Sequence, residues 1–296
     1  MKEAVIVSTA RTPIGKAYRG AFNNTESPTM GGHAIREAVK RAGIEPEEVD
    51  DVIMGCAVQQ GTSGFNIGRT AGIVAGLPIT VSGMSIDRQC SSGMMAIATA
   101  AKQIIHDGMP IVVGAGLESI SLVQNEHQNQ YRATDPNVLK IAGAAYMPMI
   151  DTAEVVAKRY NISREVQDEY ALQSQQRTAA GQENGKFDDE IVPMPSTKII
   201  FNQETENTVQ EDVLLEKDEG NRPSTTMEGI QGLKPVREGG VITAGNASQL
   251  SDGASACVLM DSKLAEQKGL NPLGAYRGMA AAGAVPWRVR QGRWGV

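Results

Sequence analysis

The sequence predicts an α/β fold in which a largely parallel sheet is covered by helices on both faces. Short apolar runs alternate with helical patterns along residues 1–119, which is the order of strand and helix units in this class. Most of these runs are apolar, as expected for strands buried on both faces. The 32 glycines among 296 residues suit tight connections between strands and helices.

The elements are predicted in the following order. Strands are expected at residues 4–8, 51–58, 84–89 and 111–113, the last one stopping at Gly114. Helices are expected at residues 30–42, 66–75 and 91–106, and Gly43 is a typical residue for the end of the first. The α/β pattern resumes after residue 240 with a short strand, a buried strand in GASACVLMD, a helix at residues 262–268 and a strand at residues 274–281.

Residues 120–240 differ from the rest because they are polar and show little apolar periodicity. One clear helix is predicted there, from Ser163 to about Gln182, with Ser163 as its N-cap and Glu165 in its first turn. We interpret this region as a long insertion on the ligand-binding edge of the sheet.

Composition excludes several classes of function. The net charge of −6 argues against nucleic acid and anionic membranes as partners. The start of the chain, MKEAVIVSTARTP, fits neither a secretory signal nor a membrane span. Three scattered cysteines and three histidines form neither a disulfide framework nor a metal site. We therefore expect no bound metal and a cytoplasmic location.

Cys90 is the candidate nucleophile. It stands between a strand-like run and an Ala-rich helical pattern that Ser91, Ser92 and Gly93 open. The N-terminus of a helix favours negative charge, so a thiol there tends to ionise. The alternative is that Cys90 is a small buried apolar residue. Core packing is the preferred interpretation for the other two cysteines, because VIMGCAVQ and ASACVLM are apolar strand-like runs.

No partner for this nucleophile is identified from the sequence. His106 lies sixteen residues further along the helix, roughly 24 Å from Cys90 at 1.5 Å per residue. His33 belongs to the first amphipathic helix, and His127 lies in polar insertion sequence. The segment VVGAGLES is not a dinucleotide site, because Ser119 occupies the position of the third glycine.

Residues 1–283 taken together resemble the thiolase family, which includes acetyl-CoA acetyltransferases and 3-ketoacyl-CoA thiolases. The resemblance rests on the order and spacing of six motifs: ARTPIGK, NIGRTAG, DRQCSSGMMAI, GAGLESIS, TAEVVAKRY and VITAGNASQLSDGAS. It implies the α/β thiolase fold, with this chain supplying the N-terminal half and a long loop-domain insertion while the C-terminal half is largely missing. The last motif favours a thiolase over a decarboxylating ketosynthase of the same fold.

The resemblance also implies the chemistry. Cys90 matches the nucleophile that carries the acyl-enzyme thioester when 3-ketoacyl-CoA is made or cleaved, and its backbone N–H would line an oxyanion hole. Ser248 matches the serine that contacts the pantetheine arm of coenzyme A. Three further residues match CoA-pocket positions: Ala244, Val236 and Met149. Coenzyme A and acyl-CoA are then substrates, and no permanently bound cofactor is implied.

Two residues depart from the family pattern. Val236 stands where many members have Phe, and Pro148 stands where short-chain biosynthetic members have His.

The same resemblance divides the chain. Residues 1–119 and 241–270 correspond to the N-terminal α/β half, and residues 120–240 to the loop domain with the CoA pocket. Within it, the segment from Gln124 to Lys140 resembles an oligomerisation loop, so a homodimer or homotetramer is expected. Residues 271–283 correspond to the first strand of the C-terminal half, and residues 284–296 form an aberrant tail.

Three elements of that second half are missing from the sequence: the Asn of an NEAF motif, the His of GHP and the Cys of CxGGG. Two hypotheses follow. One is a CoA-dependent acyltransferase of the thiolase type. The other is a truncated or frameshifted thiolase, catalytically inactive or retained as a CoA-binding remnant.

Overall fold

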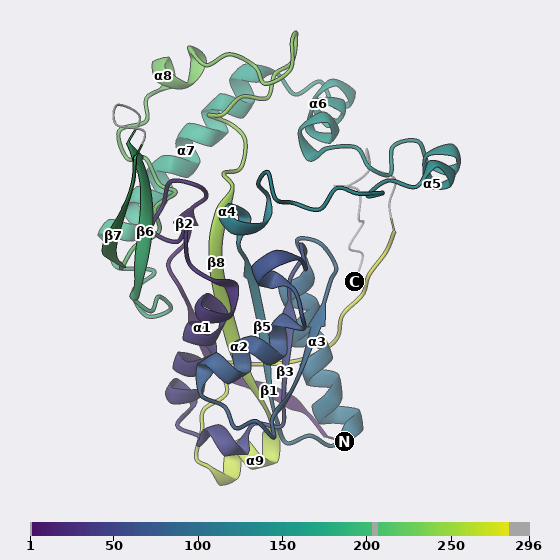
Figure 1. Ribbon diagram of the computed structural model, residues 1–296, viewed down its shortest axis with the longest axis vertical. Coiled ribbons are helices and arrows are strands. Elements are labelled where there is room, and N and C mark those ends of the chain that lie inside the picture. The colour runs from purple at the N-terminus through teal and green to yellow at the C-terminus, as the bar shows by residue number, and fades with distance from the viewer. Residues whose placement is uncertain (1, 203–206, 284–296) are drawn as a thin grey trace. The chain divides into compact units, whose positions relative to one another are not determined.

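The computed structural model describes residues 2–202 and 207–283, which form two compact units (Figure 1). The described residues of the first unit are 2–128, 187–202, 207–220 and 250–279, and those of the second are 129–186, 221–249 and 280–283. The predicted insertion, residues 120–240, therefore contributes to both units, and its assignment as a loop domain stays a prediction. The predicted tail at residues 284–296 lies outside the described residues.

The first unit contains a mixed sheet, seven-stranded in the described part of the chain, with the order β4-β3-β5-β8-β1-β9 and β2 paired to β8. Its strands are β1 (Ala4–Arg11), β2 (Gly15–Lys16), β3 (Asp51–Gly55), β4 (Ser82–Ile86), β5 (Ile111–Glu118), β8 (Ser251–Asp261) and β9 (Gly274–Ala275). Strand β3 is parallel to both β4 and β5. Strand β8 is antiparallel to both β5 and β1.

The prediction of a largely parallel sheet is therefore wrong for β8, the antiparallel strand between β5 and β1. The chain leaves the sheet after Glu118 at the carboxyl end of β5 and re-enters it at Ser251. Glu118 pairs with Gly253, so the chain returns at the same edge at which it left. A strand that returns at this edge has to run in the opposite direction.

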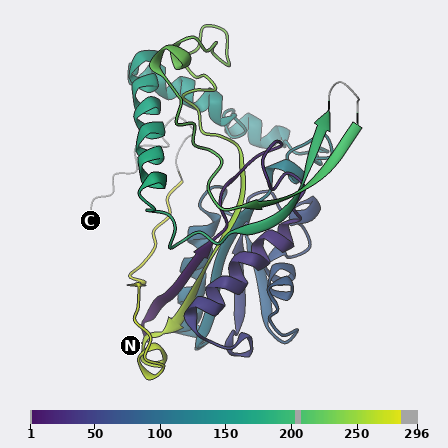
Figure 2. The same cartoon turned by 90° about the vertical axis from the view of Figure 1, so that its left-hand side faces the viewer.

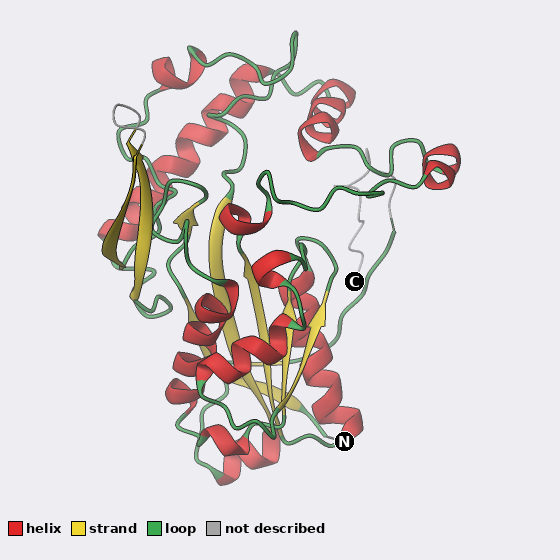
Figure 3. Cartoon of the chain, viewed as in Figure 1, coloured by secondary structure: helices red, strands yellow, loops and turns green. Residues whose placement is uncertain are grey.

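Helices cover both faces of the sheet, as predicted (Figure 3). Helices α1 (Ser27–Ala42) and α2 (Ile67–Ala75) pack on one face and enclose a core with Met30, Ile35 and Val52. Helix α3 (Ser92–Lys102), continued by the π-helical turn η3 (Gln103–Asp107), covers the other face with its alanines and Ile104.

Several strand boundaries differ from the prediction. Strand β5 continues past Gly114 to Glu118, because this glycine does not break the strand but makes room for α3. A Cβ on Gly114 would lie 2.9 Å from the Cα of Ile97. Strands β3, β4 and β9 end earlier than predicted, at Gly55, Ile86 and Ala275.

The shorter elements of the first unit are η1 (Pro46–Glu48), η2 (Gly61–Ser63), α4 (Ile120–Val123) and α9 (Ser262–Gln267). A two-stranded hairpin of β6 (Met194–Asn202) and β7 (Asn207–Leu215) forms a separate ribbon (Figure 2). The sequence did not predict this hairpin, because polar residues on largely exposed strands hide the usual alternation.

The second unit contains α5 (Pro136–Ile141), α6 (Met149–Arg159), α7 (Arg164–Glu183) and α8 (Met227–Gln231). The predicted helix after Ser163 is confirmed as α7, and the Ser163 side chain accepts a hydrogen bond from the Val166 N–H at 3.4 Å. No helix in residues 2–202 and 207–283 is long and apolar enough to cross a membrane.

Candidate active site

The site around Cys90 forms at the carboxyl edge of three parallel strands, β4, β3 and β5. Gly55 of β3 pairs with Ile86 of β4 and with Gly116 of β5, so the three strand ends lie side by side. The Cys56 N–H donates to the Ile86 carbonyl at 3.0 Å and closes this edge. Ligands of open α/β sheets commonly bind at such an edge.

A tight turn, residues 87–92, connects β4 to α3. The Asp87 carboxylate accepts a hydrogen bond from the Gln89 N–H at 2.6 Å. The Ser92 hydroxyl accepts from the Arg88 N–H at 2.8 Å and donates to the Gln89 carbonyl at 2.6 Å. These bonds hold Gln89 in the left-handed region, at φ 48°, which a residue with a side chain adopts only at some cost. The next residue, Cys90, is exposed.

Two glycines let the first turn of α3 lie directly on the sheet. A Cβ on Gly55 would lie 2.5 Å from the Gly93 nitrogen and closer still to the Ser92 carbonyl group. A Cβ on Gly116 would lie 3.2 Å from the Gly93 Cα. Ser91, the residue after Cys90, is the N-cap of α3. The close packing therefore fixes the start of the helix at Ser92, two residues after Cys90.

The three cysteines differ in environment. Cys56 is buried, and burial together with the nearby Glu118 carboxylate raises its pKa to about 12. Burial raises the pKa of Cys257 to about 11. The interpretation of these two as core residues is confirmed. Cys90 is the exposed cysteine, and its role as a nucleophile stays a prediction.

Glu118 is a residue of this edge that sequence reasoning missed. Its carboxylate accepts hydrogen bonds from the Ala57 N–H at 2.9 Å and the Val58 N–H at 3.2 Å, and its Oε1 lies 3.6 Å from the Cys56 thiol. It thereby ties the loop after β3 to the end of β5. The sequence did contain a signal: GAGLES places an acidic residue at the end of an apolar strand, and a carboxylate in such a position needs hydrogen-bond donors.

None of the three histidines hydrogen-bonds to Cys90 within the described residues. His33 Nε2 lies 3.1 Å from the Pro193 carbonyl oxygen, and its pKa is lowered, first by burial and then by Arg36. His106 lies in η3, beyond the far end of α3 from Cys90. His127 is exposed beside Glu126, with 3.6 Å between the imidazole and the carboxylate.

The other four predicted site residues all lie in the second unit. Val236 donates its N–H to the Ile242 carbonyl at 2.8 Å, and Pro235 pairs with Thr243. Val236 and Ala244 thus belong to one short hairpin, whereas Ser248 follows it. Met149 is the first residue of α6. All four side chains are exposed.

Two acidic residues of α6 fasten this hairpin. Asp151 forms an ion pair with Arg237 at 2.6 Å. The Glu154 carboxylate accepts hydrogen bonds from the Val241 N–H at 3.0 and 3.1 Å and from the Ile242 N–H at 2.9 Å. Because α6 begins at Met149, these contacts hold Met149, Val236 and Ala244 on elements that are joined to one another.

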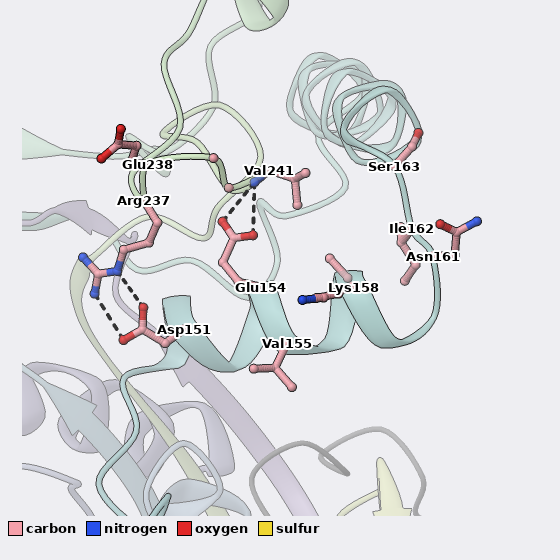
Figure 4. A pocket seen from close by; sticks show the side chains of 13 residues that line it. Asp151, Glu154, Val155, Lys158, Asn161, Ile162, Ser163, Arg237, Glu238 and Val241 are labelled. Atoms are coloured by element: carbon pink, nitrogen blue, oxygen red, sulfur yellow. Dashed lines mark hydrogen bonds and ion pairs between the residues drawn. The ribbon is translucent and has the colours of Figure 1, made fainter.

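An open pocket of about 680 Å³ lies between α6, the start of α7 and the loop that follows Val236. Figure 4 shows the Asp151–Arg237 and Glu154–Val241 contacts along one side, with Lys158, Asn161 and Ile162 along the other. The four residues predicted to contact coenzyme A do not line this pocket.

No group of three His, Cys, Asp or Glu side chains that could hold a metal ion occurs in residues 2–202 and 207–283.

Comparison with known proteins relates the chain to one family. A family model described as "Thiolase, N-terminal domain" matches residues 4–263. The chain is 41% identical over 289 residues to a 3-ketoacyl-CoA thiolase of Bacillus subtilis, covering 97% of this chain and 73% of the relative. Across the curated relatives compared, the chain spans between 61 and 73% of their length.

Two solved structures have a similar fold. The crystal structure of the Bacillus anthracis acetyl-CoA acetyltransferase superposes with a TM-score of 0.78 at 39% identity, over 92% of this chain and 69% of that one. The structure of human mitochondrial 3-ketoacyl-CoA thiolase in complex with CoA superposes with a TM-score of 0.75 at 31% identity, over 93% of this chain and 68% of that one.

Proposed function

Because this chain belongs to the thiolase family, we propose that it is a CoA-dependent acyltransferase that makes or cleaves 3-ketoacyl-CoA through a thioester on Cys90. One observation carries the proposal. Cys90 is exposed where α3 begins, at the carboxyl edge of the parallel strands, whereas Cys56 is buried and Cys257 partly so. An accessible thiol at a helix N-terminus is the setting in which a cysteine acts as a nucleophile.

In the cleavage direction, the Cys90 thiolate attacks the C3 carbonyl carbon of a 3-ketoacyl-CoA. The bond between C2 and C3 then breaks, and the acyl group stays on Cys90 as a thioester. The enolate of acetyl-CoA leaves and takes up at C2 a proton equivalent to the one that the Cys90 thiol released on ionising. The thiol of a second coenzyme A gives up its proton and attacks the thioester. The shortened acyl-CoA is released, and the leaving Cys90 thiolate takes up an equivalent proton. The Cys90 N–H would line an oxyanion hole, whereas the N–H groups of Ser91 and Ser92 already donate to the Arg88 and Gln89 carbonyls at 3.1 and 3.0 Å.

Coenzyme A is proposed to be held in the second unit by Ser248, Ala244, Val236 and Met149. Ser248 would contact the pantetheine arm, and the other three would supply the apolar wall. The joined arrangement of α6 and the hairpin supports this assignment, and so does the presence of CoA in the complex of the human mitochondrial relative. A cytoplasmic location and a homo-oligomeric assembly are further proposals.

Thiolysis of acetoacetyl-CoA by the purified chain tests this function. We expect CoA-dependent loss of acetoacetyl-CoA that disappears in Cys90→Ala and persists in Cys257→Ala, the matched control. Binding of CoA without turnover would favour the alternative, a CoA-binding protein without catalysis. Turnover that survives in Cys90→Ala would refute the role of Cys90.

A further inference from the structure

Three polar side chains of the second unit form a continuous hydrogen-bonded chain: Arg164, Asp168 and Asn246. Arg164 Nε donates to Asp168 Oδ2 at 2.6 Å, and Asn246 Nδ2 donates to Asp168 Oδ1 at 3.0 Å. Asp168 has no exposed surface. A buried carboxylate is tolerated when both its oxygens are paired, and here the partners come from the first turn of α7 and from a distant loop.

The side chains of Arg164 and Asn246 also hydrogen-bond to two backbone segments. Arg164 Nη2 also donates to the carbonyls of Ile230 at 2.8 Å and Leu233 at 3.2 Å. Asn246 accepts from the Thr243 N–H at 2.8 Å and donates to the Val241 carbonyl at 3.0 Å. The first segment, residues 230–233, leads into the hairpin that carries Val236, and the second, residues 241–243, is the returning strand of that hairpin.

The orientation of the Asn246 amide follows from its partners. The Asp168 carboxylate and the Val241 carbonyl only accept hydrogen bonds, so the NH₂ group has to face them. The Thr243 N–H only donates, so it has to meet Oδ1. Each polar atom of this side chain therefore has a partner that no other orientation would satisfy.

We propose that Asn246, held by Asp168 and Arg164, is a positioning residue for coenzyme A that fixes the backbone of residues 243–248. This inference rests on the proposed function. Ala244 and Ser248, the residues proposed to meet the pantetheine arm, lie on both sides of Asn246 and have exposed side chains. Their positions consequently depend on the course of the backbone that Asn246 fixes.

The effect on affinity follows from populations. If loss of the Asn246 bonds leaves the segment in its binding conformation for about a tenth of the time, the measured Kd rises about tenfold. A residue that only stabilises the unit would lower the melting temperature but leave the Kd unchanged at a temperature where every variant is folded.

The test measures CoA binding by calorimetry, together with amide hydrogen exchange. In Asn246→Ala we expect the Kd for CoA to rise about tenfold, equivalent to about 1.4 kcal/mol, and exchange in residues 241–248 to accelerate. Glu169→Gln is the matched control, because Glu169 is the exposed neighbour of Asp168 on α7, and its Kd should equal that of the unsubstituted chain. Asn246→Ser serves the same comparison if the alanine variant does not fold.

A second pair of variants tests the contact itself. Asn246→Asp places two carboxylates against each other and should weaken CoA binding more than Asn246→Ala does. Adding Asp168→Asn removes the repulsion and restores a donor and an acceptor at this one contact with exchanged roles, although the Val241 carbonyl still lacks its donor. The double variant should therefore bind CoA more tightly than Asn246→Asp alone and less tightly than the unsubstituted chain. Unchanged CoA affinity in Asn246→Ala and Asn246→Asp, or no recovery in the double variant, would overturn the positioning role. Absence of CoA binding by the unsubstituted chain would overturn the proposed function as well.

Discussion

Substitution of Gly55 by alanine tests how closely the nucleophile turn is fitted to the sheet. The added Cβ would lie 2.5 Å from the Gly93 nitrogen, whereas ordinary contacts begin at 3.4 Å. The Cβ is fixed to the backbone of β3 and the nitrogen belongs to the backbone of α3, so neither can rotate away. The first turn of α3 therefore has to withdraw by about 1 Å to restore an ordinary contact. Overpacking of this kind costs about 1–3 kcal/mol of folding free energy. A displacement of about 1 Å next to a reacting group can lower a rate by about 100-fold.

The assay combines urea unfolding with the rate at which Cys90 accepts an acetyl group from acetyl-CoA. Gly55→Ala should lose stability by the amount above and slow acyl transfer by about 10- to 100-fold. Gly72→Ala is the matched control, because a Cβ on Gly72 meets the Val52 side chain of the same strand at an ordinary 3.4 Å. Wild-type stability and wild-type transfer in Gly55→Ala would refute the close fit.

Three further predictions concern helix α2 and the three cysteines. Gly72→Ala should stabilise the protein by about 0.5–1 kcal/mol in urea unfolding, because it adds an alanine to the interior of α2 without a clash, and a loss of stability would contradict this. The free energy of unfolding should fall as the pH rises from about 9 to 11. The unfolded chain releases the thiol protons of Cys56 and Cys257 in this range, whereas the folded chain, with pKa values of about 12 and 11, retains them. Cys257→Ala should flatten this decline, and an unchanged slope of stability against pH would show that Cys257 does not contribute. Iodoacetamide at neutral pH should label Cys90 before Cys56 and Cys257, because Cys90 is the exposed thiol, and peptide mass spectrometry showing the reverse order would contradict the burial pattern.

Local elements were predictable from the sequence wherever one segment carries its own signal. The N-cap at Ser163 and the acidic Glu165 in the first turn predicted α7 nearly to the residue. The apolar run around Cys257 gave β8, but apolarity does not encode direction. The antiparallel course of β8 depends on where the chain leaves and re-enters the sheet, which no local pattern records.

The site was predictable in part for the same reason. Cys90 stands out because a strand, a cysteine and a helix follow one another in the sequence. Gly114 was predicted to end a strand, because glycine commonly does so. Its actual role, making room for Ile97 of α3, is a tertiary contact that the local sequence does not show. The Asp168–Asn246 contact joins residues 78 positions apart. The sequence therefore shows two ordinary polar residues where the structure has a buried carboxylate paired with a half-buried amide.

The central claim is that Cys90 carries the acyl group, and mass spectrometry of the chain after incubation with acetyl-CoA tests it most directly. We predict a mass increase of one acetyl group on the peptide that contains Cys90, reversed by added coenzyme A and absent from Cys90→Ala. Failure to detect any acetylated peptide, or acetylation at Cys56 or Cys257 instead, would contradict the account.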